Sequence, residues 1–108
     1  MRKRIFKCNI SKNEIEYTCD IANKIVYFGE TNIDPKLPKG FFLLLRTSID
    51  EFIDKGYKRF VQTISPSEWE TLLKKNEKWK LIEKHSEYYV IECDINDALF
   101  NISKGLEI

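Results

Sequence analysis

The feature that most constrains this chain is a single segment, residues 24–60. It begins with an apolar run at residues 25–28, Ile-Val-Tyr-Phe, which is typical of a strand covered on both faces. Gly29 follows at once, and a glycine there indicates a bulge, a close backbone approach or simply the strand end. Residues 33–40 contain two prolines, so we expect an irregular loop.

The second half of this segment changes from the period of a strand to the period of a helix. From Phe41 onward, apolar residues recur every three or four positions, and Gly56 is suited to end the helix in a left-handed conformation. Residues 57–64 then predict another strand. A helix between two strands indicates a right-handed crossover, so strands 24–29 and 58–64 should be parallel neighbours.

Two alternating strands are predicted before this segment. Residues 4–10 place Phe6, Cys8 and Ile10 on one face. Residues 14–21 do the same with four apolar side chains, Ile15, Tyr17, Cys19 and Ile21. A tight connection at Ala22-Asn23 follows, where Asn23 would tolerate a positive φ. These strands and the next predict an antiparallel meander.

A second helix and a hairpin are predicted after residue 64. Ser65, Pro66 and Glu68 form a helix start, with the serine as N-cap, and the helix should reach about residue 75. Strands at 79–83 and 87–95 flank a turn at His85. A short last helix, capped at Asn96-Asp97, should run through Leu99, Phe100 and Ile102.

Composition narrows the class of protein. A chain of 108 residues with 43% apolar residues predicts one globular domain, residues 1–108. A net charge of +1 with mixed signs favours neither nucleic acid nor membrane as a partner. Three scattered cysteines and one histidine predict a reducing cytoplasm, no disulfide framework and no metal site. Frequent Lys, Ile and Asn are typical of AT-rich genomes, including those of phages and viruses.

The predicted order is strand, strand, strand, helix, strand, helix, strand, strand, an α+β arrangement. This order resembles the core of the GNAT superfamily of acyl-CoA-dependent N-acyltransferases over residues 4–95. Two phrases are also similar to that family: the Asp-Pro-Lys-Leu lead-in at residues 34–37 and the link at residues 54–60. The resemblance implies transfer of an acetyl group from acetyl-CoA to a small-molecule or protein amine, with homodimer formation as an option.

The resemblance also implies where the cofactor would bind. The family's pyrophosphate loop has the form Q/R-x-x-G-x-G/A, and here only Gly40 matches a glycine, with Phe41 where a small residue is usual. Lys39 would add positive charge. Backbone groups at Thr31, Asn32 and Ile33 would meet the thioester and the pantetheine arm, and Ser65 would contact the pantetheine.

Two residues are implied as catalytic. Glu30, just past the central strand, matches the family's strand-end carboxylate, although a solvated acid would fit the same position. The second helix lacks the family's thiolate-facing tyrosine, so Tyr88 is the candidate, with Tyr89 and Tyr27 as alternatives.

Three functions therefore stay open on the sequence alone. The first is an N-acetyltransferase. The second is a non-catalytic GNAT-like accessory protein, of phage or viral type, that binds a protein partner. The third is a small interaction module that shares only the strand order. Residues 35–41 are the part of the sequence that distinguishes these readings.

Overall fold

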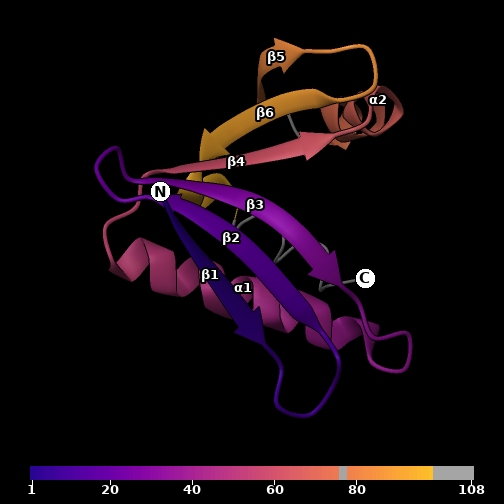
Figure 1. Ribbon diagram of the computed structural model, residues 1–108. Helices are drawn as coiled ribbons and strands as arrows, with labels where there is room; N and C mark the ends of the chain where they lie inside the picture. Colours follow the sequence, from indigo (N-terminus) through magenta and orange to yellow (C-terminus); the bar gives the residue numbers. More distant parts are fainter. Residues whose placement is uncertain (76–77, 99–108) are drawn as a thin grey trace.

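The structure, a computed structural model, describes residues 1–75 and 78–98. A six-stranded sheet has the order β1-β2-β3-β4-β6-β5, and the helix α1 packs against its β1–β3 half (Figure 1). Residues 95–98 are helical as well. The predicted α+β class and element order are confirmed. The elements are β1 (Arg2–Lys7), β2 (Glu14–Asp20), β3 (Ile25–Asn32), α1 (Pro38–Asp54), β4 (Arg59–Ile64), α2 (Pro66–Lys75), β5 (Lys80–Lys84) and β6 (Tyr89–Asp94).

The parallel pair at the centre of the sheet was also predicted correctly. β3 pairs with β4 in parallel, whereas every other neighbouring pair in the sheet is antiparallel. No helix in the described residues is both long and apolar enough to cross a membrane.

Several predicted boundaries were wrong near turns. β1 ends at Lys7 rather than at residue 10, because the backbone N–H of Cys8 donates to the carbonyl of Asn13, 3.0 Å away, and closes a turn. Ile10 consequently lies in the turn and is 84% exposed. Ile21, just past the end of β2, is 51% exposed, so it too fails to join the apolar face.

The start of α1 was predicted three residues too late. The helix begins at Pro38, so Pro38, Lys39 and Gly40 form its first turn instead of an irregular loop. Proline suits the first helical position because the N–H that it lacks has no partner there, and its fixed φ is already helical. Leu37 is the N-cap residue and supplies no side-chain cap.

Two further details of the prediction need correction. The positive φ in the β2–β3 turn belongs to Lys24, at 59°, and not to Asn23. The last helix is capped by Asp94, whose carboxylate accepts the backbone N–H of Asn96 at 2.9 Å, instead of by Asn96 itself. The predicted continuation through Leu99, Phe100 and Ile102 lies outside the described residues.

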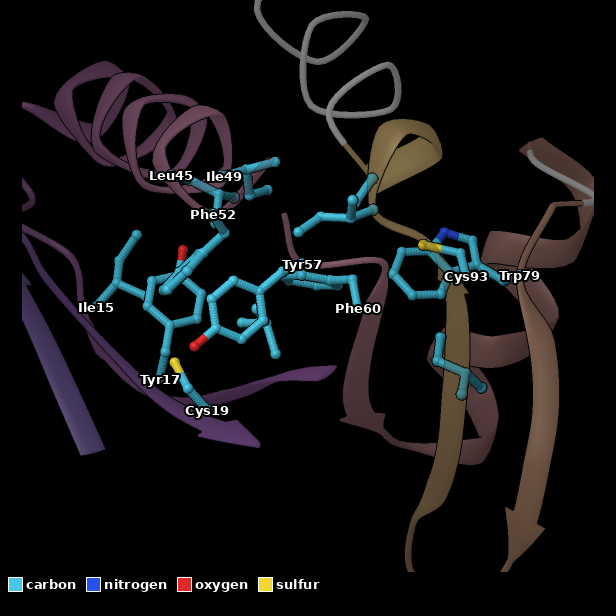
Figure 2. Packing of buried hydrophobic residues seen from close by; sticks show 14 of the residues in the cluster. Ile15, Tyr17, Cys19, Leu45, Ile49, Phe52, Tyr57, Phe60, Trp79 and Cys93 are labelled. Atoms are coloured by element: carbon cyan, nitrogen blue, oxygen red, sulfur yellow. The ribbon is translucent and has the colours of Figure 1, made fainter. Parts of the chain in front are cut away.

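The core lies between α1 and one face of the sheet. Tyr17 and Phe52 pack against each other in this core, with ring centroids 5.0 Å apart in an edge-to-face arrangement (Figure 2). The hydroxyl of Tyr17 forms a 2.5 Å hydrogen bond with Ser48 of α1, and both residues are fully buried. Val26 of β3 belongs to this core, whereas its neighbour Tyr27 points to the other face and stays partly exposed. The expectation that this strand is covered on both faces is therefore wrong.

Candidate functional site

The two parallel strands separate at their C-terminal ends. β3 and β4 pair at three positions only, Ile25 with Arg59, Val26 with Phe60, and Tyr27 with Val61. Both strands continue, β3 to Asn32 and β4 to Ile64, and Figure 1 shows their arrowheads diverging. The backbone of β3 beyond Tyr27 has no strand partner on the β4 side within the described residues, so an extended ligand could pair with it there.

A β-bulge lies where this separation begins. Between the pairs Tyr17–Phe28 and Ile15–Thr31, one residue of β2 faces two residues of β3, Gly29 and Glu30. A Cβ atom on Gly29 would lie 2.8 Å from the carbonyl oxygen of Glu16. Of the readings that the sequence left open for Gly29, the bulge with a close backbone approach is therefore correct. The bulge increases the local twist of β3 as the strand leaves β4.

The loop between β3 and α1 is held by a buried asparagine that the sequence analysis treated only as part of a turn. Asn13 is fully buried, and its side-chain oxygen accepts the backbone N–H of Asp34 at 2.7 Å. Its amide group donates to Ser11 Oγ at 2.8 Å and to the carbonyl of Leu37 at 3.0 Å. Asn13 thus ties the β1–β2 turn to both ends of the loop.

Asp34 accepts backbone N–H groups that a bound anion would otherwise use. Its carboxylate accepts the N–H of Lys12 at 3.1 Å and that of Lys36 at 2.9 Å. These two bonds, with that from Lys12 the stronger influence, lower the pKa of Asp34 below its ordinary value. The loop therefore carries its own negative group, which occupies part of its donor capacity.

The N-terminus of α1 offers few free donors. Pro38 has no N–H, and the N–H of Gly40 donates to the carbonyl of Leu37 at 3.1 Å. Among the first three helical positions this leaves the N–H of Lys39, whose side chain is exposed. The first turn contains no acidic residue, so the positive end of the helix dipole is not neutralised there.

Packing against Asn13 explains why a glycine occupies position 40. Gly40 is buried, and a Cβ atom at this position would lie 2.9 Å from the side-chain nitrogen of Asn13. Phe41 is only 8% exposed and belongs to the core. The packing of Asn13 thus suffices to explain the glycine, and a role of either residue in cofactor binding stays a prediction.

The remaining predicted cofactor residues lie on both arms of the divergence. Thr31 and Asn32 are exposed near the end of β3, and Ile33, which follows them, is 50% exposed. Ser65 follows β4 and is the N-cap of α2. Its Oγ accepts the N–H of Glu68 at 3.2 Å, and the Glu68 carboxylate accepts the N–H of Ser65 at 3.3 Å, a capping box.

The two predicted catalytic residues have different surroundings. Glu30 is exposed and lines a small cavity of about 120 Å³ with Glu14, Glu16 and the end of β3. Tyr88 is 43% exposed and stacks on His85 in the β5–β6 turn, with ring centroids 4.4 Å apart. These contacts do not bring the two residues into one cluster.

The two buried thiols, Cys19 and Cys93, give no alternative nucleophilic centre. Burial raises the pKa of Cys93 to about 12 and also raises the pKa of Cys19, so neither thiol is primed as a nucleophile. A hydrogen bond with Ser11, the main cause, lowers the pKa of Cys8. The described part of the chain contains no group of three or more His, Cys, Asp or Glu side chains that could hold a metal ion.

Comparison with known proteins places this geometry in a class of fold. No protein-family model matches the sequence, and no curated protein sequence matches it either. Solved structures do match. The PaiA N-acetyltransferase of Thermoplasma acidophilum, solved in complex with coenzyme A, has a TM-score of 0.57 and 14% identity over 76% of this chain. This chain spans 52% of that protein, about half of its length.

Two other solved structures cover more of the chain. A spermidine N-acetyltransferase SpeG chimera from Vibrio cholerae and hSSAT has a TM-score of 0.61 and 11% identity, over 90% of this chain and 70% of its own. A GNAT-family acetyltransferase from Staphylococcus aureus has a TM-score of 0.58 and 9% identity, over 86% of this chain and 68% of its own. The fold is therefore that of the GNAT acetyltransferases. At these identities the likeness concerns the fold alone.

Proposed function

We propose that this protein is an acyl-CoA-dependent N-acyltransferase that transfers an acetyl group to an amine. The observation that carries the proposal is the early end of the β3–β4 pairing, which leaves a strand edge free next to the start of α1. The solved structures with a similar fold are N-acetyltransferases; one is in complex with coenzyme A and another is named for spermidine. Because one fold can serve many functions, the proposal rests on the free edge of β3 and on the start of α1.

In this proposal the chain binds acetyl-CoA along β3 and at the start of α1. Backbone groups of Thr31, Asn32 and Ile33 would pair with the pantetheine arm as a neighbouring strand would. The exposed side chain of Lys39 and its free N–H would meet phosphate oxygens at the helix N-terminus. Bound acetyl-CoA would supply the activated acetyl thioester. Gly40 and Phe41 would shape the cradle from within the core instead of touching the cofactor closely.

Glu30 would act on the acceptor amine. An amine is protonated at neutral pH and must lose a proton before it can attack a thioester. The exposed Glu30 carboxylate at the bulge, near the free edge of β3, could accept that proton directly or through water. Tyr88, on the β4 side of the divergence, is the proposed proton donor to the leaving thiolate, and Ser65 a further contact of the cofactor. The unpaired state of the three cysteines supports a reducing cytoplasm as the setting.

One observation favours a second candidate, a GNAT-like protein that binds a partner without catalysis. The carboxylate of Asp34 accepts two backbone N–H groups of the loop region and adds a negative charge where phosphate would approach. Like charges repel, so Asp34 would weaken acetyl-CoA binding. A protein that no longer needs the cofactor would tolerate such a residue.

Calorimetry with acetyl-CoA distinguishes the two candidates. The informative variant is Lys39→Glu, because any side chain at Gly40 would strain the packing of Asn13 and confuse loss of binding with loss of folding. Lys80→Glu, an exposed lysine on β5, is the matched control for the change in net charge. Binding that is weakened by Lys39→Glu, unchanged by Lys80→Glu and strengthened by Asp34→Asn supports the acyltransferase.

The acetyl-transfer step needs its own assay. Release of free coenzyme A from acetyl-CoA should depend on an added amine, and Glu30→Gln should lower the rate without changing acetyl-CoA affinity. Absence of acetyl-CoA binding at about 1 mM, a free energy weaker than about −4 kcal/mol, would remove the enzyme proposal. Binding without amine-dependent release would favour the non-catalytic candidate.

A further inference from the structure

A second cavity lies at the opposite end of α1 from the proposed acetyl-CoA site. It measures about 550 Å³ and is bounded by the start of β1, the end of β2, the β2–β3 turn and the α1–β4 connection. α1 has 17 residues and is therefore about 25 Å long, which separates the two ends. None of the residues proposed for acetyl-CoA lines this cavity, and its volume is in the range of small-molecule sites.

Basic side chains dominate the walls of this cavity, hereafter the basic pocket. The five basic residues of its lining are Arg2, Lys3, Arg4, Lys24 and Lys55. Two carboxylates offset them. Glu16 pairs with Lys3 at 3.0 Å, and Glu51 pairs with Arg4 at 2.8 Å and with Lys55 at 3.9 Å. Positive charge is therefore in excess here, although the whole chain has a net charge of only +1.

Two of these cations have no acidic partner. Within the described residues, neither Arg2 nor Lys24 forms an ion pair. Asp20, at the end of β2, forms no ion pair with either of them in the described part of the chain; its carboxylate accepts the backbone N–H and the side-chain amide of Asn23, at 3.1 and 2.9 Å. Arg2 and Lys24 are thus available to an anion from solution.

The floor of the basic pocket is formed by buried core residues. Phe52, Tyr57 and Cys19 form it, and all three are buried members of the core. Figure 2 shows the hydroxyl of Tyr57 beside the sulfur of Cys19. A buried, partly aromatic floor under basic walls suits a compact ligand that carries negative charge at one end and a less polar body.

Lys24 is held at the rim by an unusual backbone conformation. Its φ of 59° makes it the only non-glycine residue in the described chain with positive φ, a conformation that costs roughly 1 kcal/mol for most side chains. The carbonyl of Lys24 accepts the N–H groups of Lys58 at 2.8 Å and Arg59 at 3.3 Å, which fixes this conformation. The Lys24 ammonium lies 5.6 Å from the centre of the Tyr57 ring. Local strain of this kind concentrates at ligand sites.

We propose that the basic pocket binds a small phosphorylated compound with at least two negative charges, at a site separate from that of acetyl-CoA. Guanidinium groups bind phosphate oxygens in a bidentate manner and ammonium groups bind them as point charges, so the mixture of Arg2, Arg4 and the lysines suits a phosphate ester or diphosphate. The volume accommodates more than a single inorganic ion, and the aromatic floor would accept an organic body.

Calorimetric titration with ADP and with inorganic pyrophosphate tests the proposal on the whole chain. The double variant Arg2→Gln/Lys24→Gln removes the two unpaired cations. The control Lys80→Gln/Lys84→Gln removes two cations from β5, at the far edge of the sheet, and changes the net charge equally. We expect the pocket variant to raise the Kd of both probes by roughly tenfold or more, and the control and Lys39→Glu to leave it nearly unchanged. Higher salt should weaken binding.

A second measurement does not depend on the variants. Backbone amide shifts of the wild-type protein upon ADP addition should move at the β2–β3 turn and at Tyr57, and not at residues 31–41. No binding of either probe at about 5 mM would overturn the proposal, as would equal effects of the two double variants. Shift changes confined to the start of α1 would also overturn it, because ADP would then occupy the acetyl-CoA site alone.

Discussion

Replacing Asn13 with alanine removes the one side chain that joins the β1–β2 turn, the loop after β3 and the start of α1. The side chain makes three hydrogen bonds, at 2.7 Å with the Asp34 N–H, 2.8 Å with Ser11 Oγ and 3.0 Å with the Leu37 carbonyl. Asn13 is 0% exposed, so water cannot replace these bonds without entering the structure. The loss should therefore exceed that of a surface substitution.

The expected loss follows from these bonds. Each intramolecular hydrogen bond contributes about 1 kcal/mol net, and a donor left unpaired adds a desolvation cost of similar size. Asn13→Ala should thus lower the free energy of unfolding by about 3 kcal/mol. For a domain of this size each kcal/mol shifts Tm by about 4–8 °C, so the midpoint should fall by about 12–24 °C.

Urea unfolding followed by tryptophan fluorescence measures the change. The matched control is Asn23→Ala, which also removes a side-chain amide, one that donates at 2.9 Å to Asp20 on the exposed β2–β3 turn. That control should cost less than about 1 kcal/mol, because water can satisfy the partner. If the two variants lose equal stability, the argument that Asn13 holds the loop is wrong.

Three further predictions concern other positions. The hydrogen bonds that Asp34 accepts lower the pKa of its carboxyl group. The ionised carboxylate therefore stabilises the fold fully at pH values above the ordinary aspartate pKa of about 4, and this contribution is lost as the pH falls through the lowered pKa. Wild type should therefore exceed Asp34→Asn in urea stability at neutral pH, and the difference should vanish in strong acid. Ser48→Ala should destabilise more than Tyr17→Phe, by about 1–2 kcal/mol, because it leaves the buried Tyr17 hydroxyl unpaired, whereas Ser48 keeps its bond to a helix carbonyl at 2.8 Å. Equal losses would refute this. Gly29→Ala should lower the free energy of unfolding by about 2 kcal/mol, because the added Cβ would lie 2.8 Å from a backbone carbonyl oxygen. Gly56→Ala should lower it by about 1 kcal/mol, because only its φ of 87° causes strain. Thermal unfolding should show the larger loss for Gly29→Ala.

Predictions from the sequence succeeded where one local pattern carried the information. Ile15, Tyr17 and Cys19 alternate strictly, and all three are buried on the α1 side. Pro66 at the first position of α2 and Ser65 before it marked the helix start to the residue, because capping depends only on neighbours in the chain. The parallel relation of β3 and β4 followed from the crossover rule without any knowledge of contacts.

Predictions failed where contacts distant in sequence decide the outcome. One failure was local: Pro38 was predicted to lie in the loop, although proline suits the first helical position, and it is the first residue of α1. Ile10 and Ile21 continue the apolar alternation of their strands, yet the chain turns before each can reach the core. For the candidate site, the sequence analysis ended the strand at residue 29, three residues before Asn32, and extended the loop through Gly40; the hydrogen bond between Asn13 and Leu37, 24 residues apart, has no local signature.

The sequence by itself determined the order of the elements, the α+β class and the central unit of residues 24–60, because the periods of strands and helices and the chemistry of caps are local properties. Only the tertiary structure decided where β3 leaves β4, that Asp34 binds backbone N–H groups of its own loop region, and that five basic side chains from separate elements share one cavity. The physical reason is that hydrogen-bond satisfaction and charge accumulation depend on distances in space, which many weak contacts along the whole chain establish together.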